Sequence, residues 1–192
     1  MILARLIFAA GMLSDAGLAS PAAAEVHQNR LNEALELEDR GDLEGAKRIL
    51  RQIAELARQS QTPGIVLPAI LCKLGSLEQD QTHYLEAERL YKHSVELWRS
   101  LPGGRHIGLA QSLNNLASVY YETGRKALAE DICRQSLSIR LELQGPRHPD
   151  VALEYSNLAA NAYRQKRYKE AESWAWKAVE IWDRLPPGSS PV

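Results

Sequence analysis

The stretch GPRHPD contains the side chains that most resemble an active site in this sequence. It places Arg147, His148 and Asp150 among a glycine and two prolines. A histidine flanked by a cation and a carboxylate can exchange protons near neutral pH. The same pair of residue types recurs 42 positions earlier, as Arg105 and His106. The recurrence favours a connector within a repeat over a unique catalytic site.

As a connector, this stretch is expected to end one helix and begin the next. Gly145 and Pro146 break the preceding helix, whereas Pro149 suits a first helical turn because its missing N–H is not needed there. Asp150 would lie near the positive end of the new helix's dipole. Four connector side chains remain candidates for ligand contacts at the edge of a groove: Arg105, His106, Arg147 and His148.

No other pattern predicts catalysis, a metal site or a cofactor. The histidines show no HExxH spacing, and neither a GxSxG motif nor a glycine-rich phosphate loop after a strand is present. A nucleophilic cysteine would meet a histidine only by coincidence of the fold. We therefore predict that the chain is not an enzyme and holds no cofactor or metal.

The composition is that of an ordinary folded domain. Of the 192 residues, 45% are hydrophobic and 24% are charged, with a formal net charge of −1. These values are typical of soluble globular proteins. Because lysine and arginine are not concentrated on one face, nucleic-acid binding is not expected.

Residues 1–24 are predicted to be a signal peptide. Arg5 precedes a short apolar run, and Ala22 and Ala24 provide the small residues of a cleavage site. The run is too short to span a bilayer, so stable membrane insertion is not expected. Cleavage would leave a chain beginning at Glu25, periplasmic or secreted in a bacterium. The alternative is a cytoplasmic protein with an apolar N-terminal helix.

The two cysteines, Cys72 and Cys133, are not expected to pair. An even count in an exported chain suggests a disulfide. However, the two occupy different places in successive repeats, and Cys133 falls within an apolar helical stripe. It is predicted to be a small buried hydrophobic residue.

A helical stripe recurs four times at nearly constant spacing. Its leading alanines are Ala46, Ala87, Ala129 and Ala171, which are 41, 42 and 42 residues apart. Apolar or small residues follow each alanine at offsets of three, four, seven and eight, as one face of a helix requires. Another helical stripe precedes each of them, so the sequence predicts four helix pairs.

These pairs resemble the tetratricopeptide repeat, whose minimal period is 34 residues. The small residue at the helix crossing is matched by Ala34, Gly75, Ala117 and Ala159. The turn residue is matched by Gly41 and Gly124, whereas Thr82 and Lys166 depart from the pattern. The longer 42-residue period, with LNNLASVYYETGR and GPRHPDVALEYSNLAANAYRQKRYKEAE, resembles the kinesin light chain type of this repeat.

The resemblance implies an all-α, right-handed solenoid of about four helix–turn–helix repeats. It also implies a non-enzymatic scaffold that binds a segment of another protein. The expected domain covers residues 25–185, followed by a Pro/Gly/Ser tail at 186–192. Its repeats are expected at residues 27–60, 68–101, 109–143 and 151–185.

The first helices of such a solenoid line a concave groove. One position recurs along them at the repeat spacing, as Asn32, Lys73, Asn115 and Asn157. An asparagine offers a donor and an acceptor to a peptide backbone, and the resemblance implies such a clamp at Asn115 and Asn157. Alternatively, these asparagines only bridge neighbouring helices. Five other side chains are candidates for the same groove: Asn114, Ser118, Tyr121, Tyr163 and Arg164.

The C-terminal end of the repeats is the second candidate surface. Three tryptophans, Trp174, Trp176 and Trp182, fall in the final helix, and the tail after it is too short to form a capping helix. An uncovered face of this kind favours contact with another protein or a second copy of the chain. The alternative is that Trp174 and Trp182 pack within their own repeat, since Trp98 occupies the position equivalent to Trp182.

Overall fold

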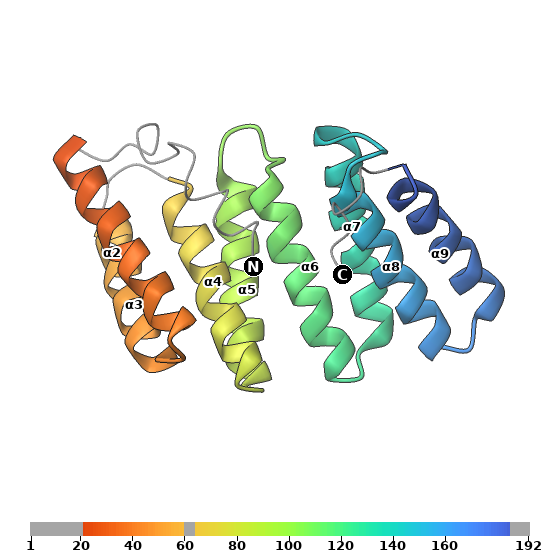
Figure 1. Cartoon of the computed structure of the whole chain (residues 1–192), viewed down its shortest axis with the longest axis horizontal. Helices are drawn as coiled ribbons and strands as arrows, with labels where there is room; N and C mark the ends of the chain where they lie inside the picture. Colours follow the sequence, from red (N-terminus) through yellow and green to blue (C-terminus); the bar gives the residue numbers. More distant parts are fainter. Residues whose placement is uncertain (1–20, 60–63, 185–192) are drawn as a thin grey trace. The chain divides into compact units, whose positions relative to one another are not determined.

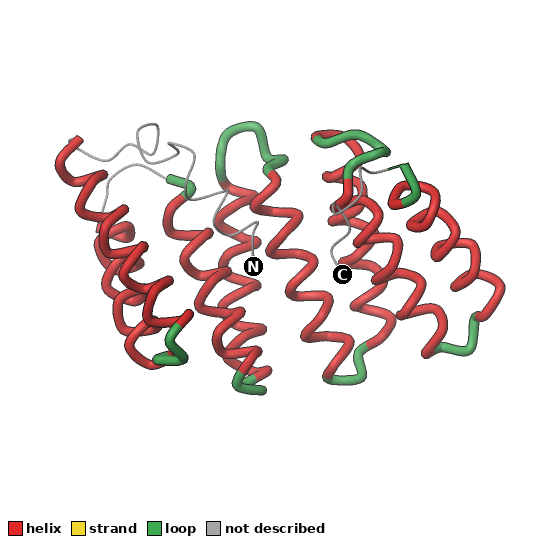
Figure 2. The backbone as a smooth tube through the Cα atoms, viewed as in Figure 1, coloured by secondary structure: helices red, strands yellow, loops and turns green. Residues whose placement is uncertain are grey.

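The computed structural model describes residues 21–59 and 64–184, and all of its regular structure is helical. Short loops join α2 to α3, α4 to α5, α6 to α7 and α8 to α9 (Figure 2). The described helices are α2 Pro21–Asp39, α3 Leu43–Gln59, α4 Val66–Asp80, α5 Tyr84–Ser100, α6 Ile107–Glu122, α7 Lys126–Leu143, α8 Pro149–Arg164 and α9 Tyr168–Trp182. The predicted all-α solenoid class is confirmed.

The chain divides into two compact units between Pro102 and Gly103. The N-terminal unit contains repeat 1, α2 with α3, and repeat 2, α4 with α5. The C-terminal unit contains repeat 3, α6 with α7, and repeat 4, α8 with α9. Within each unit, the second helix of one repeat also packs against the first helix of the next (Figure 1).

Residues 1–20, most of the predicted signal peptide, and the tail at 186–192 lie outside the described residues. The first described helix begins at Pro21, before the predicted cleavage point.

The same turn closes all four helix pairs. Its central residue has a positive φ: 83° at Gly41, 61° at Thr82, 79° at Gly124 and 61° at Lys166. The next N–H donates to a carbonyl five residues earlier, for example from Arg125 to Tyr120 at 2.8 Å. This bond satisfies a helix-terminal carbonyl, as in a Schellman motif. Thr82 and Lys166 therefore adopt the backbone of the glycines that they replace.

Buried serines tie the second helix to the first in repeats 2 and 3. Ser94 Oγ donates to the Pro68 carbonyl at 2.6 Å, and Ser136 Oγ donates to the Ala110 carbonyl at 2.8 Å. Both serines are fully buried. The two serines occupy equivalent positions in their repeats. The polar residue in each of these second-helix stripes therefore has a hydrogen-bond acceptor on the first helix.

Each unit has its own apolar core between its helices. In the N-terminal unit the largest fully buried side chains are Tyr91, Leu50, Ile53, Ile70, Leu71 and Leu77. In the C-terminal unit the buried apolar cluster contains Ala117, Cys133, Leu137, Val151, Ala152, Leu158, Ala178 and Ile181. Burial of this surface stabilises helix pairs that could not be stable alone.

Cys72 and Cys133 do not form a disulfide with each other. Cys133 is buried, and burial raises the pKa of its thiol to about 12. The side chain is therefore a protonated part of the core and not a nucleophile near neutral pH.

Candidate functional site

Two asparagines bridge the first helices of the C-terminal unit. Asn157 Nδ2 on α8 donates to Asn114 Oδ1 on α6 at 2.8 Å, and both side chains are half-buried. This bond is the bridging role left open by the sequence. Among the described residues, it leaves Asn114 Nδ2 and Asn157 Oδ1 for other partners, because an amide has both donor and acceptor groups. Bridging and ligand binding are therefore compatible at this pair.

Asn115, the next residue on α6, is held from its own helix. Gln111 Nε2 donates to Asn115 Oδ1 at 2.9 Å, one helical turn away. Gln111 in turn accepts a bond from Arg140 NH2 on α7 at 3.0 Å. Asn115 and Ser118, which follows it on α6, are both half-buried. The orientation of the Asn115 amide is thus linked to the interior of the C-terminal unit.

A second contact joins α6 to α8 seven residues beyond the asparagine pair. The Arg164 guanidinium lies over the Tyr121 ring, 4.2 Å from its centroid. Burial raises the pKa of the Tyr121 hydroxyl. Tyr163, which occupies the position 42 residues after Tyr121 and was also a groove candidate, takes a different partner: it is 64% exposed and packs edge-to-face with Tyr168 at 5.4 Å between ring centroids.

The equivalent helices of the N-terminal unit present charge. Lys73 Nζ on α4 forms an ion pair with Glu38 on α2 at 2.6 Å. Asn32 is exposed on α2 and accepts a bond from Gln28 Nε2 at 3.1 Å. The four residues at the recurring position, Asn32, Lys73, Asn115 and Asn157, therefore lie on first helices, but they do not share one chemistry.

The GPRHPD stretch is a helix connector, as predicted. Gly145 has a φ of 83°, Pro149 is the first residue of α8 and Asp150 lies in its first turn. His148 Nδ1 accepts the Asp150 backbone N–H at 3.2 Å, so the ring caps α8. Arg147 is exposed.

The earlier connector is built differently. His106 precedes α6 with an extended backbone and makes no side-chain cap. Arg105 pairs with Glu142 near the end of α7. Although the Arg-His pair recurs in the sequence, only His148 of the second connector caps the helix that follows it.

The three C-terminal tryptophans lie in different environments. Trp176 is 65% exposed, whereas Trp174 and Trp182 are half-buried. Trp174 stacks on Tyr155 of α8 at 5.6 Å between centroids, and the Lys177 ammonium lies 4.2 Å from its ring centroid. Only Trp176 of the three offers a largely exposed ring.

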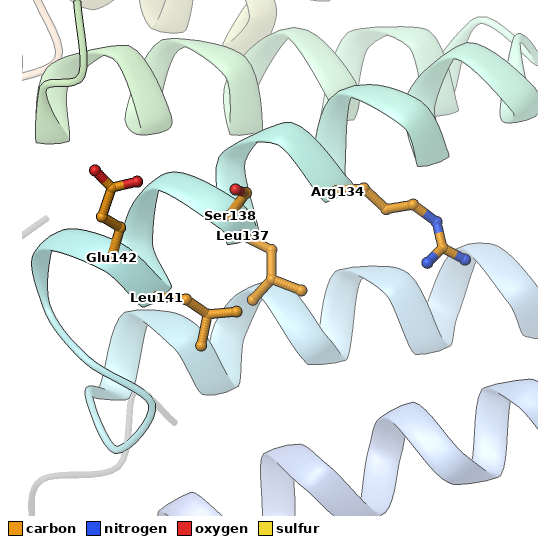
Figure 3. Close-up of a pocket in the computed structure, with 5 residues that line it drawn as sticks. All are labelled: Arg134, Leu137, Ser138, Leu141 and Glu142. Atoms are coloured by element: carbon orange, nitrogen blue, oxygen red, sulfur yellow. The ribbon is translucent and has the colours of Figure 1, made fainter.

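A shallow hollow of about 550 Å³ lies along one stripe of α7 (Figure 3). Its lining side chains are Arg134, Leu137, Ser138, Leu141 and Glu142. The charges at its two ends are already paired, Arg134 with Glu130 and Glu170, and Glu142 with Arg105. This hollow was not predicted from the sequence, because the same stripe also contributes to the core through Leu137.

A buried charged cluster between α7 and α8 was also not predicted from the sequence. The Arg140 side chain is 1% exposed and pairs with Asp150 at 2.5 Å and with Glu154 at 3.0 Å. Burial raises the pKa of the Glu154 carboxyl, although Ser136 and Arg140 oppose that effect. A signal was present, because Arg140 occupies the repeat position that holds Trp98 and Trp182 elsewhere.

Within residues 21–59 and 64–184, no three histidine, cysteine, aspartate or glutamate side chains are placed to hold a metal ion. No described helix combines the length and apolar character needed to cross a membrane.

Comparison with known proteins identifies the repeat. The tetratricopeptide repeat family profile matches residues 66–142 and 127–184. A search of curated protein sequences found no match. Similar solved structures include BtubC (BKLC) from P. vanneervenii, with a TM-score of 0.72 and 19% identity over 100% of this chain and 76% of that one.

Another is the structure of nearly identical TPR-like repeats of a kinesin light chain candidate from Podosopora anserina. It has a TM-score of 0.67 and 16% identity over 97% of this chain and 95% of that one. A point variant of the same repeats gives the same TM-score and identity over 95% and 92% of the two chains. The fold is thus that of kinesin light chain-like repeats, and the chain belongs to the tetratricopeptide repeat family.

Proposed function

We propose that the chain is a non-enzymatic interaction module that binds an extended segment of a partner protein along α6 and α8. The observation that carries this proposal is the Asn114–Asn157 pair. Its donor and its acceptor match the carbonyl and N–H of a peptide backbone, whatever the peptide's side chains are. The family supports the general role, since tetratricopeptide repeats serve as protein-interaction scaffolds.

The second contact between α6 and α8 sets a length for the bound segment. Tyr121 and Arg164 each lie seven residues beyond the asparagine of the same helix, which is about 10 Å along a helix. An extended chain covers that distance in about three residues. A partner segment held by the amide pair would therefore reach the Arg164 guanidinium with a side chain about three residues away. That cation favours an acidic residue there.

The asparagine pair provides the direct test. Replacing both Asn114 and Asn157 with Ala should abolish capture of partners from an envelope extract of the native host, because the pair would then offer neither its donor nor its acceptor. The helical circular dichroism should be unchanged, since both side chains are only half-buried.

A control variant changes a polar residue on a second helix of the same unit. Ser138 is an exposed polar residue on α7, so Ser138→Ala should leave capture intact. Undiminished capture by the asparagine double variant would show that the amides do not bind the partner.

Self-association through the C-terminal end is the second candidate function. The specific observation is Ala175, which is exposed although its counterparts Tyr91 and Cys133 are buried in repeats 2 and 3. Beside it, Trp176 adds a large exposed ring. In this alternative, a second copy covers the face of α9 that a further repeat would cover in a longer array.

Sedimentation velocity of the chain at increasing concentration tests this alternative. Trp176→Glu should keep the protein monomeric if the face mediates association, whereas Trp182→Glu would act mainly by disturbing a half-buried residue. A monomer at all concentrations for the unmodified chain would eliminate the alternative without affecting the groove proposal.

The signal peptide leads to a proposal about location. Export to the periplasm or the medium would remove residues 1–24, so N-terminal sequencing of the protein from its host should begin at Glu25. Recovery of an uncut chain from the cytoplasm would support the alternative location.

A further inference from the structure

Arg140 forms a buried junction between three helices of the C-terminal unit. From α7, its guanidinium donates to Glu154 and Asp150 on α8 and to Gln111 on α6, at 3.0, 2.5 and 3.0 Å. Its NH1 also reaches Gln144 at 3.3 Å. Each nitrogen of the guanidinium therefore has an acceptor, which an arginine excluded from water requires.

Packing alone does not require a charge at this position. The equivalent residues of repeats 2 and 4 are Trp98 and Trp182, so the repeat accepts a large apolar side chain there. Replacing a buried ion pair with apolar groups is often neutral or even stabilising. The distinctive property of Arg140 is therefore the direction of its hydrogen bonds.

Those directions determine the orientation of a groove amide. A guanidinium only donates hydrogen bonds, so Gln111 must turn its Oε1 toward Arg140 and its Nε2 away from it. Gln111 Nε2 then donates to Asn115, which must turn its Oδ1 toward Gln111. As a consequence, the Asn115 Nδ2 group lies at the opposite edge of the planar amide, away from Gln111 Nε2.

We propose that Arg140 is a positioning residue for the groove, which acts through Gln111 to hold Asn115 with its amide donor directed away from Gln111. The proposal rests on the proposed peptide groove and deepens it, because it assigns Asn115 the role of donor to a carbonyl of the partner backbone. The Asn114–Asn157 pair supplies both hydrogen-bonding directions, whereas Asn115 is restricted to one.

The first test replaces Gln111 with Glu. The new carboxylate keeps the shape of the side chain and still accepts from Arg140, but it cannot donate to Asn115. Asn115 should therefore reverse and donate its Nδ2 to that carboxylate. In nuclear magnetic resonance spectra of the labelled protein without ligand, its side-chain amide protons should shift downfield and exchange more slowly. Unchanged Asn115 amide resonances would overturn the relay.

The second test removes the arginine and its buried counter-charge together. Arg140→Trp with Glu154→Ser introduces the residues found 42 positions earlier, Trp98 and Ser112, and leaves no unpaired buried glutamate. The scalar coupling across the hydrogen bond from Gln111 Nε2 to Asn115 Cγ should disappear. Helical circular dichroism should remain that of the unmodified protein.

A coupling that persists in this double variant would show that Arg140 has only a structural role. If the double variant does not fold, the Gln111→Glu result still decides whether the orientation of Asn115 follows residue 111, because that change keeps Arg140 and its ion pairs with Asp150 and Glu154. Both readings are made without a partner. They can therefore fail while the double replacement of Asn114 and Asn157 still abolishes capture, which would remove the relay and leave the proposed function. They can also succeed while that double variant captures partners normally, which would remove the proposed function and leave the relay.

Discussion

Thr82 and Lys166 adopt a backbone conformation that suits glycine. Both have a φ of 61°, whereas the other two equivalent turns use Gly41 and Gly124. A side chain in this region brings its Cβ close to the following carbonyl, at a cost of about 1–2 kcal/mol. The cost is greatest for a β-branched residue, so Thr82 is the more strained of the two.

Thr82→Gly should therefore stabilise the N-terminal unit. Relief of the strain exceeds the extra chain entropy that glycine adds to the unfolded state, so we expect a gain of about 1 kcal/mol in the free energy of unfolding. Urea unfolding followed by circular dichroism measures the change. The reciprocal control, Gly124→Ala, should destabilise by a similar amount. A loss of stability in Thr82→Gly would contradict this account.

Close helix packing in repeat 2 depends on the pair of Gly75 and Tyr91. A Cβ added to Gly75 would lie 2.7 Å from Tyr91 Cε1, well inside contact distance. The equivalent residues of repeat 1 are Ala34 and Leu50, which are also buried. The first-helix residue is therefore smaller where its second-helix neighbour is larger.

Gly75→Ala should destabilise the protein by about 2 kcal/mol, because the new methyl group overpacks the α4–α5 interface. Adding Tyr91→Leu, which recreates the Ala34–Leu50 combination, should recover at least about 1 kcal/mol of that loss. Free energies of unfolding for the two single variants and the double variant measure the coupling. Strictly additive losses would show that the two side chains do not compete for space.

Glu130 links the second helices α7 and α9 through charge. It pairs with Arg134 on its own helix at 2.8 Å and with Arg167, which immediately precedes α9. Burial acts to raise the pKa of Glu130, but hydrogen bonds from Arg134 and Arg167 outweigh it and lower that pKa below its ordinary value of 4.5. The folded state therefore releases this proton more readily than the unfolded state.

A depressed pKa of this kind gives stability above the unfolded-state value that is lost as the pH falls through the folded-state value. Glu130→Gln should thus cost about 1 kcal/mol at pH 7, and the difference from the unmodified protein should shrink once the pH is below 4.5. Urea unfolding at pH 7 and pH 3 tests both points. An equal deficit at the two pH values would show that the charge of Glu130 is not responsible.

The helices and turns could be predicted from the sequence because their residue patterns recur. Alanines spaced by 41 or 42 residues and the two turn glycines indicated every helix pair, even where Thr82 or Lys166 replaced glycine. The contacts of the candidate site were harder to predict, because they join different helices. The periodicity of one helix places Arg140 on the buried stripe that begins at Ala129. However, neither its pairing with Glu154 nor the Asn114–Asn157 bond follows from one helix, since each involves the neighbouring repeat.

At the scale of the molecule, the division at Pro102 and Gly103 predicts two zones of stability. In repeat proteins each repeat depends on its neighbours, so a local loss of packing spreads within a contiguous block. Leu158 is 1% exposed in the core of the C-terminal unit, and Leu71 is 2% exposed in the core of the N-terminal unit. Truncating either side chain to Ala should cost about 2–5 kcal/mol.

Hydrogen exchange of the intact chain can separate the two zones. Leu158→Ala should lower amide protection in the C-terminal unit, over α6, α7, α8 and α9, and leave α2, α3, α4 and α5 close to their original protection. Leu71→Ala is the matched control and should produce the reverse pattern. Equal loss of protection in all of these helices, for either variant, would mean that the chain unfolds as one cooperative block despite its division. A separate response would mean that the asparagine pair between α6 and α8 and the Arg140 junction lie within a unit whose stability is set by its own two repeats.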